Sequence, residues 1–306
     1  MQVSTSAEVV ALTNPDEALH ALARTREFVA KDGDTVWPGY AGAHFGIVLI
    51  EANREVLLCD NRVPQGFEAT ASEPVTGCTM ALGPRSWRAP QMLAAMPVFG
   101  PPSVIVMGRP EGVGIGVAEW QVVLLHEHFH QWQSELPDYY DRVEALGLSG
   151  GDKTGMWMLE YPFPYKDAGV EETFIKTRDA LLTAYAAIGT QEFESLTRSY
   201  LQERAAFARS VSENDWLYAE FQLWQEGIAR WSEIVIGSLH PDEAVQASAR
   251  ARALHTLEEL KTAKIADLER ISFYAMGAVE GFVLDAYRPN WRKSYVMHLA
   301  IGPLFR

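Results

Sequence analysis

The sequence predicts an α+β protein in which a small β-containing unit, residues 1–112, precedes a mostly helical domain, residues 113–306. Short apolar runs rich in β-branched residues lie in the first third of the chain, and long segments of helical periodicity fill the rest. The chain has 306 residues, 48% of them hydrophobic and 22% charged. It is therefore long and apolar enough to form one large or two medium globular domains.

In the small unit the pattern predicts one helix followed by three strands. Residues 16–31 have helical spacing. The runs "HFGIVLI" and "EVLLCD" are separated by "EANR", which is typical of a β-hairpin, and "PSVIVMG" predicts a third buried strand.

The remainder of the chain predicts a series of helices joined by one long irregular segment, residues 137–169. Pro137 ends the first helix, "SEND" at residues 212–215 offers an N-terminal cap to a later one, and Gly277 and Gly281 allow another helix to approach closely. The predicted helices span residues 117–136, 170–188, 191–210, 213–237, 241–270 and 271–287.

Charge and cysteine content limit the partners and the location that we expect. The net charge of −14 repels phosphate backbones, so nucleic acid is not an expected partner, and no basic amphipathic or long apolar run predicts a membrane partner. Cys59 and Cys78 form no metal-ligand pattern, and we interpret them as reduced thiols, although a disulfide between them stays possible. No signal peptide is visible, so a cytoplasmic location is expected; a leader removed from the natural chain stays an open alternative.

The stretch "VVLLHEHFHQWQ", residues 122–133, contains the pattern H-E-x-x-H. On a helix, His126 and His130 share a face and can direct ring nitrogens at one ion, while Glu127 can reach a water molecule beside that ion. This spacing predicts two zinc ligands and a general base. His128 points to another side of the helix and is interpreted as a bystander; a histidine-rich turn without metal is the alternative.

A catalytic zinc ion needs a third protein ligand, and "QWQSEL" after His130 excludes a third histidine of the metzincin type. Glu226 in "LWQEGIARWSE" is the best candidate, because a carboxylate on an apolar helix face needs a cationic partner. The alternative is an exposed Glu226 paired with Arg230; Glu220 and Glu160 are the reserve candidates for the ligand.

The combination of H-E-x-x-H with a later glutamate resembles the gluzincins, and "QEGIARWSE" is similar to the N-E-G-x-A segment of M1 aminopeptidase-like enzymes. The resemblance covers about twenty residues. It implies a zincin-like catalytic domain and a Zn²⁺-dependent peptidase with His126, His130 and Glu226 as ligands and Glu127 as base. Gln225 stands where that family usually has asparagine, and the family's G-x-M-E-N loop is absent.

Further polar residues are candidates for supporting roles. Hydrolysis of an amide needs a donor to the developing oxyanion, for which Tyr274 is the first candidate. The other candidates are His298, Tyr161 and Tyr165, and Glu233 and Glu119 are candidate carboxylate partners for the ligand histidines. The expected function is zinc-dependent hydrolysis of a peptide or small amide substrate. A non-catalytic metal-binding scaffold and a non-heme Fe(II) enzyme with the same ligands are the alternatives.

Overall fold

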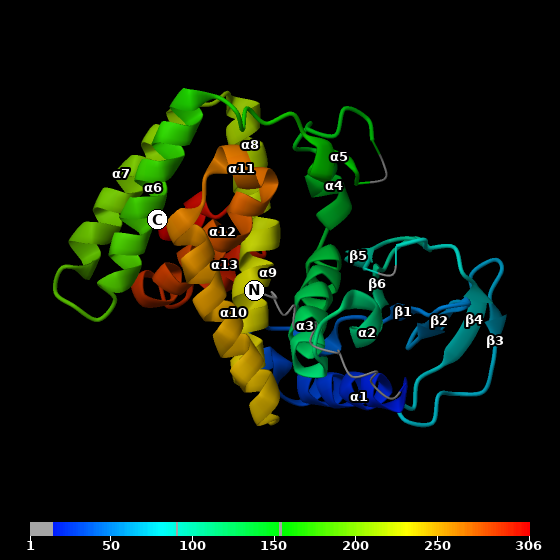
Figure 1. The fold of residues 1–306 in the computed structure, drawn as a ribbon. Coiled ribbons are helices and arrows are strands. Elements are labelled where there is room, and N and C mark those ends of the chain that lie inside the picture. Colours follow the sequence, from blue (N-terminus) through cyan, green and yellow to red (C-terminus); the bar gives the residue numbers. More distant parts are fainter. Residues whose placement is uncertain (1–14, 90, 153–154) are drawn as a thin grey trace, which may run out of the picture. The chain divides into compact units, whose positions relative to one another are not determined.

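The computed structural model describes residues 15–89, 91–152 and 155–306 of the chain (Figure 1). These residues form two compact units. The first unit contains the described residues up to Trp132 together with His240–Val245, and the second contains Gln133–Leu239 and Gln246–Arg306. The sequence-based boundary at residue 112 divides the chain at a different point.

The first unit contains a six-stranded sheet with the strand order β3-β4-β2-β1-β6-β5 (Figure 1). Strand β1 pairs antiparallel with β2, which confirms the predicted hairpin, and parallel with β6. The three predicted strands thus form the buried centre, while β3, β4 and β5 were not predicted. The strands are β1 (Ile47–Ile50), β2 (Arg54–Leu58), β3 (Glu68–Ala69), β4 (Met80–Pro84), β5 (Leu93–Met96) and β6 (Val104–Gly108).

Helices α1, α2 and most of α3 complete the first unit. The α3 helix has an apolar first half, because Trp120, Val122, Leu124 and Leu125 are fully buried. Its last two residues belong to the second unit, so one continuous helix passes from the first unit into the second. The helical segments are α1 (Pro15–Asp32), η1 (Gly33–Thr35), η2 (Tyr40–Gly42), α2 (Pro110–Val113) and α3 (Val117–Ser134).

All regular elements among the described residues of the second unit are helices, which together with the sheet of the first unit confirms the predicted α+β arrangement (Figure 1). Ser212 caps α8 as "SEND" predicted, with a reciprocal bond to Asp215. Its elements are α4 (Tyr139–Glu144), α5 (Trp157–Glu160), α6 (Ala168–Ala186), α7 (Phe193–Arg209), α8 (Glu213–Gln222), η3 (Leu223–Gly227), α9 (Ile228–Ser238), α10 (Glu243–Thr262), α11 (Ile265–Leu268), η4 (Glu269–Ile271), α12 (Ser272–Tyr287), α13 (Trp291–Tyr295) and η5 (Gly302–Phe305).

The helix predicted over residues 241–270 is interrupted. It ends at Thr262, and the backbone of Lys264 is extended. The last carbonyls of a helix have no partner within that helix. Here the carbonyl of Ala263 accepts a hydrogen bond from Arg178 of α6 at 2.6 Å.

The small residues of α12 permit a close helix crossing, as predicted. A Cβ atom at Gly277 would lie 2.7 Å from the Cα atom of Gly227, and one at Gly281 would lie 2.6 Å from the ring of Trp231. The π-helical segment η3 and the start of α9 therefore lie directly against α12.

Cys59 and Cys78 are joined by a disulfide bond, so the interpretation of both as reduced thiols is wrong. Cys59 follows β2 and Cys78 precedes β4, and these strands pair antiparallel. The pairing of two strands brings the sulfur atoms together, and nothing in the spacing of the two cysteines indicates it.

None of the described helices combines the length and the apolar character that crossing a membrane requires. The expectation that the chain has no signal peptide concerns its first residues, and most of these lie outside the described residues.

Candidate metal centre

Helix α3 places the two motif histidines of the first unit side by side. The Nε2 atoms of His126 and His130 lie 3.1 Å apart, with the ring planes at 78°. Two nitrogen ligands about 2.1 Å from a tetrahedral zinc ion lie about 3.4 Å apart, close to the observed separation. The predicted ligand pair is therefore arranged so that both rings could bind one ion, and His126 is only 7% exposed.

His128 is a core residue of the first unit. Its ring stacks on Phe45 with the centroids 4.0 Å apart, and its Nδ1 lies 3.0 Å from the side-chain oxygen of Gln131. Burial lowers the pKa of His128 to about 4, so the ring is neutral at pH 7. This arrangement agrees with the interpretation of His128 as a bystander.

Glu127, the predicted base, is held by the edge strand of the sheet. The backbone N–H of Ala95 in β5 donates a hydrogen bond to Glu127 Oε2 at 2.8 Å. The side chain is 6% exposed, so its carboxylate occupies a defined position in a largely dry environment. Glu127 is adjacent to His126 in the chain, and the same helix turn thus carries the ligand pair and the base.

In the second unit, Glu226 lies in the π-helical segment η3, which joins α8 to α9. Single π-turns inside α-helices often occur at functional sites. Here side chains also bond to the carbonyls of this segment. Gln133 Nε2 donates to the carbonyls of Trp224 and Gln225 at 3.3 and 3.2 Å, and Tyr295 Oη donates to the carbonyl of Trp224 at 2.7 Å.

Gln133 stands three residues after His130 on the same helix, α3. Its contacts fix the end of α3 to the carbonyl of the residue that precedes Glu226. Gln133 was not among the residues that the sequence predicted for the site. In the sequence, the only indication of a role for Gln133 is that an amide side chain occurs among the apolar residues of the motif helix.

A polar cluster surrounds Glu226 within the second unit. Arg270 Nη1 lies 3.5 Å from Glu226 Oε1 and donates to Tyr274 Oη at 2.5 Å. Burial, followed by the charge of Glu226, raises the pKa of Tyr274 well above its usual range, and Tyr274 is also hydrogen-bonded to Glu226. The structure therefore brings together Glu226 and Tyr274, the predicted ligand and the predicted oxyanion donor, and adds Arg270, which was not predicted.

The predicted alternative partner of Glu226, Arg230, pairs with Glu233 at 2.9 Å. Glu233 is almost fully buried and also faces Arg252 at 3.2 Å, so it belongs to an ion-pair network of the second unit. Glu119, the other candidate carboxylate partner, is half-buried on α3 in the first unit.

The reserve ligands occupy other environments. Glu220 is buried, receives Arg204 at both carboxylate oxygens and accepts the backbone N–H groups of Ile301 and Gly302 at 2.9 Å. Glu160 is exposed on α5. Glu220 therefore anchors the C-terminal segment.

The other oxyanion candidates have partners within the second unit. Tyr161 donates to Asp215 at 3.0 Å, and Tyr165 lies 3.4 Å from the hydroxyl of Tyr218. His298 is half-buried near the C-terminal end.

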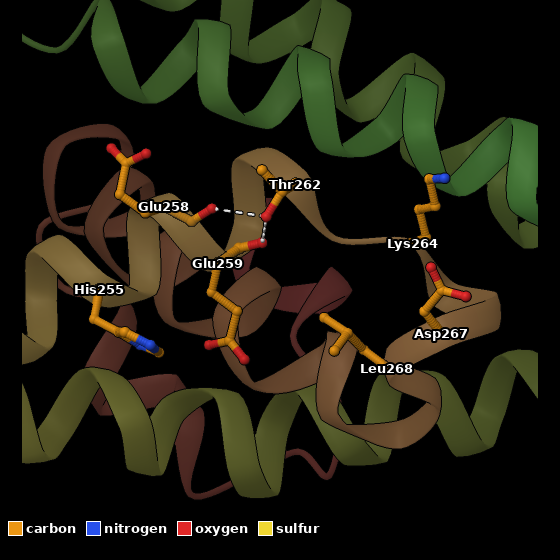
Figure 2. A pocket seen from close by; sticks show the side chains of 7 residues that line it. All are labelled: His255, Glu258, Glu259, Thr262, Lys264, Asp267 and Leu268. Atoms are coloured by element: carbon orange, nitrogen blue, oxygen red, sulfur yellow. Dashed lines mark hydrogen bonds between the residues drawn. The ribbon is translucent and has the colours of Figure 1, made fainter. Parts of the chain in front are cut away.

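A cavity of about 490 Å³ lies in the second unit beside α10 and α11 (Figure 2). None of the predicted site residues lines it. The lining side chains are mixed in charge and belong to His255, Glu258, Glu259, Thr262, Lys264, Asp267 and Leu268. A second cavity of about 400 Å³ is lined by residues of the 148–162 segment, Glu160 and Tyr161 among them.

The described residues thus show a histidine pair with its carboxylate in the first unit and a glutamate with a tyrosine and an arginine in the second. Comparisons with known proteins add no family to this picture: no protein-family model, curated protein or solved structure matches the chain.

Proposed function

We propose that the protein is a zinc-dependent hydrolase, in which His126, His130 and Glu226 hold one Zn²⁺ ion. The observation that carries this proposal is the 3.1 Å separation of the two histidine Nε2 atoms on one partly buried turn of helix α3. Two imidazole nitrogens and one carboxylate oxygen form a donor set that suits catalytic zinc and leaves a coordination position for water.

The position of Gln133 supports Glu226 as the third ligand. Gln133 and His130 are three residues apart on α3 and therefore share a side of that helix. Gln133 is bonded to the carbonyl of Gln225, the neighbour of Glu226. The backbone next to Glu226 is thus bonded to a side chain at the C-terminal end of α3.

When bound, zinc lowers the pKa of a water molecule and polarises the substrate carbonyl. Glu127 accepts the proton of the attacking water and returns it to the leaving amine. The hydrogen bond from Ala95 to Glu127 Oε2 keeps the carboxylate in place for both transfers. The hydroxyl of Tyr274 has one proton, which it donates to Glu226 in this structure; it would donate to the oxyanion that forms when water attacks the carbonyl only after turning away from that carboxylate. Peptides and related amides are the proposed substrates.

Elemental analysis of the purified protein tests the metal site. We expect about one zinc ion per chain in the wild type and loss of that zinc in Glu226→Ala. Glu160→Ala, which removes an exposed carboxylate, is the matched control and should retain zinc. Unchanged zinc in Glu226→Ala, or iron in place of zinc in the wild type, would overturn the proposal.

The disulfide bears on the proposed location of the protein. The sequence-based expectation is cytoplasmic, but disulfides persist mainly in oxidising compartments. The bond between Cys59 and Cys78 therefore favours a place outside the reducing cytosol.

A further inference from the structure

Only one nitrogen of the Arg270 guanidinium, Nη1, contacts a polar partner among the described residues of the second unit. Nη1 donates to Tyr274 at 2.5 Å and lies 3.5 Å from Glu226. Within residues 15–89, 91–152 and 155–306, Nε and Nη2 of Arg270 have no hydrogen-bond or ion-pair partner. The side chain is 20% exposed, so part of this group is open to a ligand.

Other largely buried arginines of the same unit are used more fully. Arg204 donates from Nε to Glu280 and from both Nη atoms to Glu220. Arg178 donates from Nε to Asp179 and from Nη1 to the carbonyl of Ala263. A guanidinium that serves only to support the fold is expected to resemble these, since burial of unpaired donors is unfavourable.

The shape of the remaining donors selects the ligand. Nε and one Nη of an arginine form a planar edge with two parallel N–H groups, which matches the two oxygens of a carboxylate. The aromatic ring of Tyr274 lies 5.3 Å from the guanidinium carbon and restricts its orientation. A carboxylate could therefore be held in a fixed position next to Tyr274 and Glu226.

The charges around this point also favour an anion. Glu226 contributes one negative charge and Arg270 one positive charge. With Zn²⁺ bound by Glu226 and two neutral histidines, and with the carboxylate of the proposed base Glu127 included, the sum of these charges becomes about +1. The nearby Lys166 and Glu269 form an exposed pair that cancels itself.

We propose that Arg270 binds a carboxylate of the substrate through Nε and Nη2, so that the hydrolase prefers anionic substrates. This inference rests on the proposed function, because it names the substrate class of that site. The carboxylate is either the free C-terminus of a peptide or the side chain of an aspartate or glutamate.

Binding of three N-acetylated tripeptides distinguishes these sources. One has a free C-terminal carboxylate and neutral side chains, one has a C-terminal amide and a glutamate, and one has a C-terminal amide and neutral side chains. We expect one of the two anionic peptides to bind the wild type about 10- to 100-fold more tightly than the neutral peptide, as measured by calorimetry. The better anionic peptide identifies the source of the carboxylate.

The variants then assign this preference to Arg270. In Arg270→Met the ratio of dissociation constants should fall to about one, while the neutral peptide binds as before. Arg270→Lys keeps the charge but loses the planar edge, and should retain only part of the preference. Arg198→Met removes an exposed arginine paired with Glu194 and is the control, which should keep the full ratio.

The same titrations with protein treated with a chelator separate this inference from the zinc proposal. The contact of Arg270 with a carboxylate does not need the metal, so a preference for the anionic peptide should persist at reduced size. Equal binding of all three peptides to the wild type, or an unchanged preference in Arg270→Met, would overturn the inference whatever the zinc content.

Discussion

The side-chain amide of Gln133, at the end of α3, donates to the backbone carbonyl of Gln225 at 3.2 Å. This bond reaches the π-helical segment η3 directly before Glu226. It adds a side-chain donor to a carbonyl of that segment and holds the backbone beside the carboxylate. Within the second unit, the backbone beside the candidate third ligand is therefore held by one buried amide.

Replacing Gln133 with leucine should weaken both the fold and the metal site. The substitution leaves the carbonyl of Gln225 without this donor in the interior, which costs about 1–3 kcal/mol in the free energy of unfolding. Loss of a group that orients a ligand typically lowers metal affinity about 10- to 100-fold. Urea unfolding and zinc competition with a chromogenic chelator measure the two effects.

Gln121→Leu is the matched control for Gln133→Leu. Gln121 is a buried amide on the same helix, but it accepts a hydrogen bond from Arg24 in the first unit. The Gln121→Leu variant should be less stable than the wild type but should bind zinc with the same affinity. Equal zinc affinity in both variants would show that Gln133 has no role in placing Glu226.

Replacing Glu127 with glutamine should abolish most hydrolysis without removing the metal. Glutamine has nearly the same shape and keeps an oxygen that can accept the N–H of Ala95, but it cannot take a proton from water. A fall of about 10²- to 10⁴-fold in kcat is expected, with the zinc content unchanged. Mass spectrometry of a digested peptide pool gives the activity, and Glu172→Gln, which removes an exposed carboxylate paired with Lys176, is the control. Turnover at the wild-type rate in Glu127→Gln would contradict the mechanism.

The centre of the sheet could be predicted from the sequence, whereas its edges could not. Strands β1 and β6 consist mostly of consecutive apolar, β-branched residues that are buried on both faces, and β2 ends in the buried apolar run Val56–Leu58. The edge strands β3 and β5 have the sequences "EA" and "LAAM", which lack that signal. Their extended form depends on pairing with neighbours, which a local pattern does not contain.

The candidate site shows the same division between local and tertiary information. The pairing of His126 and His130 follows from the helical period alone, so the sequence predicts it. The π-turn of Glu226 accompanies the close approach of Gly227 to Gly277 on another helix, and that approach is a tertiary contact. Arg270 escaped notice because the sequence predicted it at the end of one helix and Tyr274 in the next; in the structure η4 leads directly into α12, and the spacing of four residues places the two side chains together.

Replacing Gly277 with alanine should destabilise the second unit. The new methyl group would lie 2.7 Å from the Cα atom of Gly227 and 2.7 Å from the carbonyl oxygen of Leu223, and backbone cannot move aside as a flexible side chain can. Overpacking of this kind typically costs about 1–3 kcal/mol in the free energy of unfolding, and here it also pushes on the π-turn of Glu226. Thermal unfolding and zinc content measure both consequences. Gly42→Ala meets no atom within 4 Å and should match the wild type. An unchanged melting temperature in Gly277→Ala would mean that the two helices separate easily.

Asp60 of the first unit should make stability depend on acid pH. Burial by itself raises the pKa of Asp60, but the hydrogen bonds and charge of Arg62, with a smaller effect of His44, outweigh burial and hold that pKa below its usual range. A carboxyl group with a lowered pKa in the folded state stabilises the fold above its unfolded pKa of about 3.9, and this stabilisation disappears as the pH falls through the folded value. The backbone N–H of Arg62 lies 2.8 Å from Asp60 Oδ1, so the carboxylate is directly bonded.

Urea unfolding of the wild type and of Asp60→Asn at several pH values tests this relationship. At pH 7 the variant should be less stable by about 1–3 kcal/mol, because the ion pair with Arg62 is lost while burial remains. The difference should hold down to about pH 5 and shrink below pH 4, where the wild-type carboxylate takes up a proton. Glu172→Gln, which removes an exposed carboxylate paired with Lys176, should follow the wild type across the range. A difference for Asp60→Asn that is constant from pH 7 to pH 2 would assign the loss to packing, because a lost charge interaction has to fade as the carboxylate is protonated.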